Sequence, residues 1–229
     1  MENNRYIIDT LEGKNISMLG FADISEVGSE QRQGLRYGIC VAVALNVFPS
    51  ESEPHEDYYN EYRKLNATLK EICLFLEEKI TERGYSAYSL FRNKQNEDFR
   101  TLLPFKTLAT RAGLGWIGKS STLVTREFGN AVRLGGVITD MPFETAEPIN
   151  KSFCRNCNAC VEACPAGAIK GELWELGRDR DEMIDPVKCK NKVIERGEKM
   201  GVKVGSCGIC LSVCPWTRKY MESKLNCNR

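Results

Sequence analysis

The sequence predicts an α+β protein of two domains, an α/β domain over residues 1–145 and a cysteine-rich domain over residues 146–229. The first part holds an apolar β-branched run and a long amphipathic pattern, whereas nine of the eleven cysteines fall in the second part. Residues 141–152, with Pro142 and Pro148, form the predicted linker. Apolar residues make up 42% of the chain and charged residues 28%, which is typical of a globular protein.

The first part predicts a lead-in, a buried strand and a long helix. Residues 1–30 are expected to be irregular or helical. Residues 37–47 form a continuous apolar run, which is typical of a central strand that is buried on both faces. Over residues 57–83, apolar side chains recur at steps of three and four, which predicts an amphipathic helix that ends at Gly84. These side chains are Tyr58, Tyr62, Leu65, Leu69, Ile72, Leu76 and Ile80.

The rest of the α/β domain predicts shorter elements. Residues 85–91 are expected to form a short strand, residues 93–100 a loop and residues 103–111 a short helix. Residues 121–125 then predict a strand that pairs, as a hairpin, with residues 131–139. The single histidine, His55, is expected on a surface loop.

A glycine-rich segment lies between the short helix and this hairpin, with the sequence Ala-Gly-Leu-Gly-Trp-Ile-Gly-Lys from residue 112 to residue 119. Its three glycines permit positive φ angles and close approach of the backbone to a flat or anionic ligand. The segment is neither a Walker A loop nor a dinucleotide-binding fingerprint, because a predicted helix and not a strand precedes it. Two interpretations stay open, a ligand site and a tight helix-to-strand corner.

The cysteine spacing is the strongest signal in the chain. Residues 154–165 read C-x2-C-x2-C-x3-C-P, the bacterial ferredoxin spacing for a [4Fe–4S] cluster. In two-cluster ferredoxins the fourth cysteine of such a run binds the other cluster, so a second set is expected. It is present as C-x2-C-x3-C-P over residues 207–215, with Cys189 upstream. Eight cysteines therefore predict two [4Fe–4S] clusters.

The exchange of fourth ligands predicts how the cysteines divide. The first cluster is expected to take Cys154, Cys157, Cys160 and Cys214, and the second Cys164, Cys189, Cys207 and Cys210. Cys227 is not expected to be a ligand. The alternative is a pair of zinc sites, but zinc ribbons favour two C-x2-C pairs separated by a loop.

Composition bounds the cellular setting and the partners. No apolar run approaches the roughly 20 residues that cross a bilayer, and the N-terminus lacks the layout of a secretory signal. The total number of cysteines is odd, and eight of them lie in cluster spacing. Both observations favour a reducing cytoplasm over a disulfide scaffold. Residues 186–224 hold nine basic and three acidic residues. This excess could dock an acidic electron donor or a phosphate backbone, or could be a solvated surface.

Together, residues 112–119, the four-cysteine run, Cys189 and the Cys207–Trp216 stretch resemble the epoxyqueuosine reductases, which are relatives of the corrinoid-dependent reductive dehalogenases. The resemblance covers about residues 30–220. It implies a cobalamin-binding α/β domain followed by a ferredoxin-like domain with two [4Fe–4S] clusters. It also implies that the corrin is lined by Gly113, Gly115, Trp116, Gly118 and Lys119.

The resemblance further implies an iron–sulfur oxidoreductase that passes low-potential electrons from a ferredoxin or flavodoxin through both clusters to cobalamin. The family reduces an epoxide on a modified tRNA base. Its proton donor lies in an Asp-[ST]-x-Pro motif; Asp98 is the candidate here, although Pro104 follows it at a different spacing. The chain ends at Arg229, so a short member without the helical-repeat domain is expected. The acceptor of the electrons is left unidentified. The alternatives are an electron carrier or reductive activator of a separate corrinoid protein without its own cobalamin, and the reduction of epoxyqueuosine in tRNA.

Overall fold

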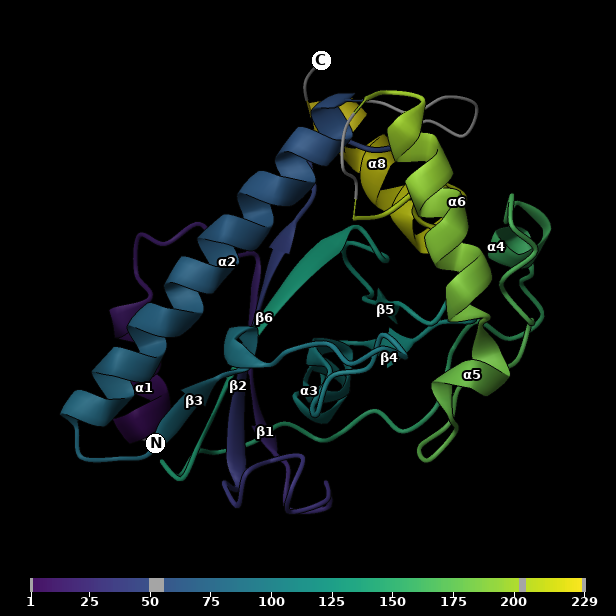
Figure 1. The fold of residues 1–229 in the computed structure, drawn as a ribbon. Coiled ribbons are helices and arrows are strands. Elements are labelled where there is room, and N and C mark those ends of the chain that lie inside the picture. Colours follow the sequence, from purple (N-terminus) through teal and green to yellow (C-terminus); the bar gives the residue numbers. More distant parts are fainter. Residues whose placement is uncertain (1, 50–55, 202–204, 228–229) are drawn as a thin grey trace. The chain divides into compact units, whose positions relative to one another are not determined.

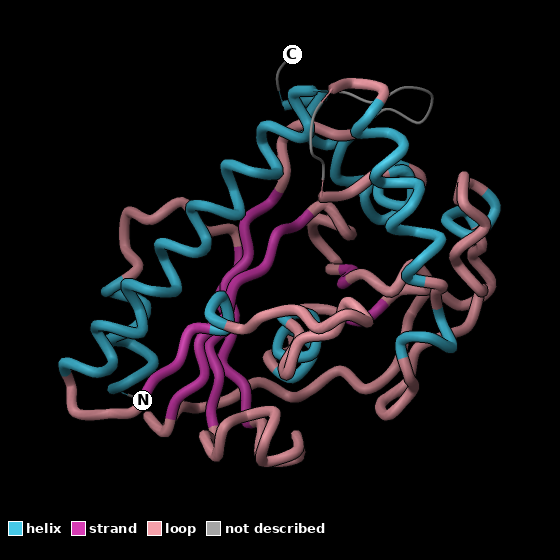
Figure 2. Tube along the Cα trace, in the orientation of Figure 1, coloured by secondary structure: helices cyan, strands magenta, loops and turns pink. Residues whose placement is uncertain are grey.

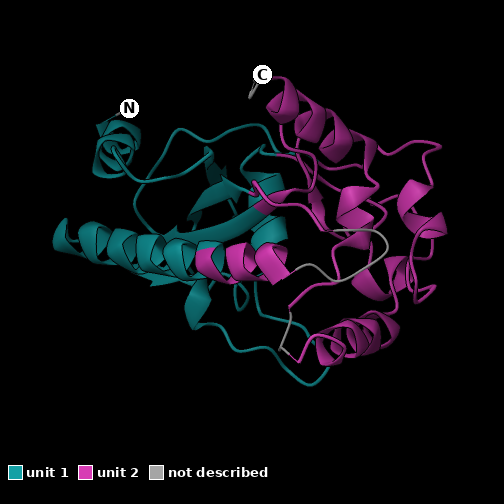
Figure 3. Ribbon diagram, turned by 90° about the horizontal axis from the view of Figure 1, so that it is seen from above, with its two compact units in different colours: residues 1–44, 65–114, 133–149 teal, residues 45–64, 115–132, 150–229 magenta. Residues whose placement is uncertain are grey.

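The computed structural model describes residues 2–49, 56–201 and 205–227, and its internal contacts divide the chain into two compact units (Figure 3). Unit 1 comprises residues 1–44, 65–114 and 133–149, and unit 2 comprises residues 45–64, 115–132 and 150–229. Each unit is assembled from three segments, and the predicted boundary at residue 145 stays a prediction. His55 and Lys203 lie outside the described residues.

Unit 1 is built on a four-stranded sheet with the order β1-β2-β6-β3 (Figure 1). β1 pairs antiparallel with β2, and β3 pairs antiparallel with β6. Seven of the eight residues of β2 are buried, because this strand has a neighbour on each side and is covered on both faces. The predicted central strand is therefore confirmed. The strands are β1 (Met18–Asp23), β2 (Tyr37–Ala44), β3 (Ala87–Ser89) and β6 (Val132–Thr139).

Helices α2 (Glu56–Glu82) and α3 (Phe105–Arg111) pack on opposite faces of this sheet. A β-carbon at Gly135 of β6 would lie 2.7 Å from the sulfur of Cys73 in α2. One at the next residue, Gly136, would meet Leu108 of α3. Successive strand residues point to opposite faces, so the two glycines let a helix approach from each side. The predicted helix at residues 57–83 is confirmed, and its apolar stripe is buried apart from the half-buried Tyr62.

The N-terminal lead-in differs from the prediction. It contains α1 (Glu2–Thr10) and also β1, an edge strand that the expectation of an irregular or helical segment missed. Gly20 interrupts the apolar pattern of β1, which hides the strand in the sequence. The glycine is required because a β-carbon there would lie 2.8 Å from the carbonyl oxygen of Ala112.

The predicted hairpin between residues 121–125 and 131–139 is wrong. Strand β5 (Leu123–Val124) pairs with β4 (Trp116–Ile117) in unit 2, whereas β6 enters the main sheet between β2 and β3. A turn does form where it was expected, since Thr125 N donates to Gly129 O at 2.7 Å. Residues 135–139 of β6 are all buried, which suits a central strand with two covered faces, and this burial decides the pairing.

Unit 2 consists of short helices and loops around the β4–β5 hairpin (Figure 2). The two longest helices wholly within it, α6 and α8, have thirteen residues each. Among the described residues, no helix is long and apolar enough to span a membrane. The helices are α4 (Ala159–Glu162), α5 (Arg180–Met183), α6 (Pro186–Glu198), α7 (Ile209–Ser212) and α8 (Pro215–Cys227); unit 1 also holds the short 3-10 helix η1 (Leu90–Arg92).

Substitutions on α2 test whether its apolar stripe stabilises the core of unit 1. Leu69 is fully buried, so Leu69→Ala leaves a cavity and should lower the free energy of unfolding by about 2–5 kcal/mol. The neighbouring Lys70 is exposed, and Lys70→Ala should change it by about 0.5 kcal/mol or less. Urea unfolding followed by circular dichroism under anaerobic conditions measures both. Equal losses in the two variants would contradict the packing described.

Candidate metal centre

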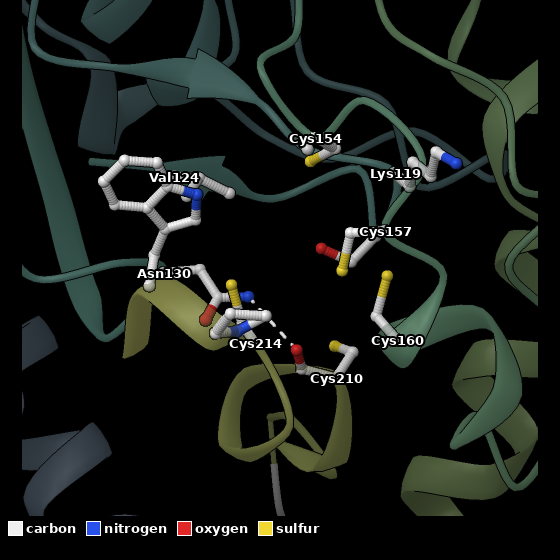
Figure 4. Close-up of a pocket in the computed structure, with 12 residues that line it drawn as sticks. Lys119, Val124, Asn130, Cys154, Cys157, Cys160, Cys210 and Cys214 are labelled. Carbon is white, nitrogen blue, oxygen red and sulfur yellow. Dashed lines mark hydrogen bonds between the residues drawn. The ribbon is translucent and has the colours of Figure 1, made fainter. Parts of the chain in front are cut away.

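Five of the eight predicted ligand cysteines line one cavity of about 140 Å³ inside unit 2 (Figure 4). These are Cys154, Cys157, Cys160, Cys210 and Cys214. Their sulfur atoms lie around a common space, although the cysteines come from two chain segments that are fifty residues apart. The cavity is completed by Gly118, Lys119, Ser120, Val124, Asn130, Pro215 and Trp216.

Tight turns and short helices present these sulfur atoms. Arg155 has a φ of +48° and Cys157 N donates to Cys154 O at 3.0 Å, so the chain reverses between the first two cysteines. Cys160 then lies on α4. In the second segment Gly208 has a φ of +76° and begins α7, which carries Cys210. The frequent reversals explain why a small unit can direct so many thiols inward.

The electrostatic neighbours of Cys160 identify the first group of four. Burial, followed by smaller contributions from the nearby Cys154, Cys214 and Cys157, raises the pKa of the Cys160 thiol to about 11. These are the three partners that the sequence predicts for Cys160. Burial also raises the pKa of Cys214, while hydrogen bonds from the backbone of Thr217 and Trp216 and from the Thr217 hydroxyl oppose the rise.

The remaining cysteines form a second group around Cys189 on α6. Burial, followed by smaller contributions from the nearby Cys207 and Cys164, raises the pKa of Cys189 to about 11. Burial raises the pKa of the Cys210 thiol well above its usual value. Smaller contributions come from four nearby cysteines, Cys207, Cys189, Cys160 and Cys164. Cys210 thus lies where the two groups meet. The grouping supports the predicted division of ligands, which stays a prediction.

A single zinc ion fits this arrangement poorly. Four sulfur ligands at the zinc–sulfur distance of about 2.3 Å would lie roughly 3.8 Å from one another. Within the part of the chain that the structure describes, no three His, Cys, Asp or Glu side chains converge in a way that could hold one ion. Cysteines that surround a cavity instead suit a cubane, whose iron atoms occupy the space between them. The donor set therefore fits an iron–sulfur cluster.

The glycine-rich segment forms part of the wall of this cavity. A β-carbon at Gly118 would lie 2.8 Å from Val124 Cγ2 and 3.4 Å from the sulfur of Cys154, and one at Gly115 would collide with the carbonyl oxygen of Val124. These glycines thus allow close packing within unit 2. Gly113, in unit 1, has a φ of +68° and packs against Ala146.

The two large side chains of this segment are covered by the chain itself. Trp116 is only 1% exposed and makes edge contacts with Phe153 and Trp216, at centroid distances of 5.1 and 5.3 Å. Lys119 is 6% exposed, and its ammonium group donates to Asn158 Oδ1 at 2.7 Å. In Figure 4 this group turns away from the sulfur atoms, so Lys119 braces the loop that follows Cys157.

The structure also shows where the predicted acid Asp98 lies, and it reveals two polar residues near the cavity that the sequence analysis missed. Asp98 is exposed in the loop before α3 and is not among the residues that line the cavity. Asn130 bonds to Thr217 and to the carbonyl oxygen of Cys210, but neither residue belongs to a motif that the sequence analysis identified. Only their contacts in the folded chain reveal them.

Comparison with known proteins agrees with this geometry. Residues 153–217 match the family model of a 4Fe-4S double cluster binding domain. The epoxyqueuosine reductase of Synechocystis sp. is 26% identical over 222 residues, which cover 89% of this chain and 73% of that protein. The enzyme of the same name from Prochlorococcus marinus is 30% identical, over 80% of this chain and 58% of that protein.

Solved structures show the same fold at lower identity. An epoxyqueuosine reductase in complex with an epoxyqueuosine-modified tRNA-Tyr stem loop has a TM-score of 0.59 at 19% identity, covering 95% of this chain and 66% of that one. A reductive dehalogenase described in terms of B12-dependent dehalogenation has a TM-score of 0.70 at 17% identity, covering 98% and 34%. The chain thus spans only part of the length of most of these relatives. It is similar in sequence to the epoxyqueuosine reductases, and its residues 153–217 match a 4Fe-4S double cluster binding domain.

Proposed function

We propose that this chain is an iron–sulfur oxidoreductase of the epoxyqueuosine reductase type, which moves low-potential electrons through two [4Fe–4S] clusters to a bound cobalamin. The observation that carries the proposal is the convergence of Cys154, Cys157, Cys160 and Cys214 on one cavity, beside a second group around Cys189. Cys210 lies next to members of both groups, so the two clusters would be neighbours. Adjacent clusters allow an electron to pass from one to the other.

The residues of this chain hold and insulate the clusters. Four thiols on each side would bind the iron atoms, with Cys164 and Cys214 exchanged between the two sequence motifs. The buried Val124 and the half-buried Trp216 line the cavity, and Trp116 packs against Trp216, so these side chains would limit the access of water to the first cluster. A dry apolar shell controls the potential of a cluster, so this wall would hold it in a defined range.

Cobalamin is the proposed last carrier, which would deliver electrons to the substrate. Support comes from the relatives, among them a dehalogenase structure described in terms of B12. The side chains of Trp116 and Lys119 do not fit a direct corrin contact, because neighbours within unit 2 cover both of them. We therefore assign Gly118 and Lys119 of this segment to the wall of the first cluster.

The acceptor that the relatives favour is epoxyqueuosine in tRNA, because the similar curated proteins carry this activity in their names. The rival proposal is an electron carrier or reductive activator without its own cobalamin. The two proposals can be distinguished by corrin binding, because the oxidoreductase would retain a corrin and the electron carrier would not.

The electron donor is proposed to bind at α6. Cys189 lies on this helix between the exposed Lys188 and Lys190, and the apolar Val187 and Ile194 are 56% and 46% exposed. A basic surface with exposed apolar side chains, next to a cluster ligand, suits an acidic one-electron donor such as a ferredoxin or flavodoxin. The donor would reduce the second cluster first.

Cluster loading tests the ligand assignment. The reconstituted chain should hold about eight iron atoms, and Cys160→Ala should lose the first cluster and keep about four. Cys227→Ala is the matched control, and its iron content should not change because Cys227 is not a predicted ligand. Iron and sulfide analysis with EPR of the reduced protein measures this. Full iron content in Cys160→Ala, or its loss in Cys227→Ala, would contradict the assignment.

Corrin binding separates the two proposed functions. Cob(II)alamin added anaerobically to the loaded protein should give a changed Co(II) EPR signal, because a bound corrin loses or exchanges its axial base. With a low-potential reductant, the same sample should convert epoxyqueuosine in a tRNA stem loop. An unchanged free-cobalamin signal beside two intact clusters would favour the electron carrier.

Charge reversal on α6 tests the donor site. The double variant Lys188→Glu/Lys190→Glu should slow reduction of the clusters by flavodoxin or ferredoxin about tenfold or more at low salt, and the difference should shrink as salt rises. Stopped-flow absorbance at the cluster band follows the rate. Lys70→Glu, on α2, is the control and should leave the rate unchanged. Equal rates in all three proteins would exclude α6 as the docking surface.

A further inference from the structure

Lys119 brings a buried positive charge to the wall of the cysteine cavity. The residue is only 6% exposed, and among the described residues that line the cavity it is the one lysine, arginine, aspartate or glutamate. An ammonium group is rarely buried without a partner of opposite charge, because burial removes it from water. The question is therefore which group near the cavity offsets this charge.

Both ends of Lys119 lie beside predicted ligands of the first cluster. On the backbone side, a β-carbon at the preceding Gly118 would lie 3.4 Å from the sulfur of Cys154. At the other end, the ammonium group donates to Asn158 Oδ1 at 2.7 Å, and Asn158 directly follows Cys157. Lys119 is thus held against the turn that carries the first two ligands.

The side chain of Asn158 accepts from Lys119 and not from its own helix. Asn158 is the N-cap residue of α4, the helix that carries Cys160, and an asparagine at this position ordinarily accepts from an N–H group of the first turn. Its side chain forms no such bond here. Among the described residues, no carboxylate forms an ion pair with Lys119. Because an amide oxygen is neutral, the bond to Asn158 positions the charge without offsetting it.

The cluster proposed for this cavity would supply the opposite charge. An oxidised [4Fe–4S] core with four thiolate ligands is a dianion, and one-electron reduction makes it a trianion. A nearby positive charge stabilises the trianion more than the dianion, and so raises the reduction potential. In Figure 4 the ammonium group turns away from the sulfur atoms, so Lys119 would act through its charge and not as a hydrogen-bond donor to a ligand.

We propose that Lys119 is the internal counter-cation of the first cluster, which stabilises that cluster and raises its reduction potential above the value that the cysteines alone would give. Lys119 does not bind iron, and Asn158 is the positioning residue that fixes its charge. A higher potential at the first cluster favours the movement of electrons toward it from the second. The inference rests on the two proposed clusters but not on cobalamin or on the final acceptor.

Removal of the charge tests the proposal in the reconstituted full chain. Lys119→Met keeps a long unbranched side chain and should make reduction of the first cluster about tenfold less favourable, which lowers its midpoint by about 59 mV for a one-electron couple. Lys119→Arg keeps the charge, so its midpoint should stay close to that of the unmodified chain. Lys151→Met is the matched control, because Lys151 is exposed on the segment that leads into Cys154.

The readout is an anaerobic titration with dithionite, followed by EPR, that resolves the midpoint potential of each cluster. Cys160→Ala, which should keep only the second cluster, identifies the two signals. The titrations are repeated at low and high salt. The shift in Lys119→Met should persist at high salt, because salt screens buried charges weakly, whereas any shift in Lys151→Met should vanish.

Iron analysis separates the possible failures. If the unmodified chain holds no clusters, the proposed function fails; if both clusters are present and Lys119→Met leaves the first midpoint unchanged, only this inference fails. Equal shifts of both clusters, or an equal shift in Lys151→Met, would also overturn it. If Lys119→Met does not hold the first cluster, Lys119→Arg decides. A first cluster retained in Lys119→Arg supports the counter-cation, and its loss in both variants refutes it.

Discussion

The gathering of thiol groups around buried iron sites is the constraint on which unit 2 depends. Thiols packed together in an apolar setting resist ionisation, as the raised pKa values of Cys160, Cys189 and Cys210 indicate. Bound iron would supply the positive charge that offsets this cost, since a coordinating thiol loses its proton. Much of unit 2 is loop and short helix, so metal ligation would provide the cross-links that a large apolar core provides in unit 1.

Close backbone approach is the second requirement of the site. Gly115, Gly118 and Gly129 each stand where a β-carbon would collide with, or press on, a neighbouring segment of unit 2. Together they bring the β4–β5 hairpin and the loop before β6 against the cysteine turns. This explains a glycine-rich segment beside a cluster motif without a ligand that touches every glycine. The buried Trp116 likewise joins segments of unit 2, because it packs against Phe153 and Trp216.

Sequence reasoning was most successful where one local pattern decides the structure. The apolar stripe of α2 and the uninterrupted run of β2 were predicted because periodicity alone identifies them. The cysteine spacing led to the residues that the fold brings together, since ligand geometry fixes their separation along the chain. The pairing of β6 was wrong because two candidate partners were available and only burial on both faces selects between them.

The buried polar pair of Asn130 and Thr217 could not be predicted from the sequence, because the two residues are far apart along the chain. Asn130 and Thr217 are 87 residues apart, and nothing in either local sequence indicates a partner. Their contact exists only because Gly129 lets two distant segments touch. The covered side chains of Trp116 and Lys119 were likewise not foreseen, because a sequence that suits a flat ligand also suits the packing of a tryptophan against other aromatic rings.

The central claim is that the eight cysteines hold two neighbouring [4Fe–4S] clusters. Its most direct test is the EPR spectrum of the reconstituted chain after full anaerobic reduction with dithionite. Two adjacent clusters should give about two spins per chain, with lines broadened by the magnetic coupling between them. One spin per chain, or two uncoupled signals that saturate as isolated clusters do, would contradict it.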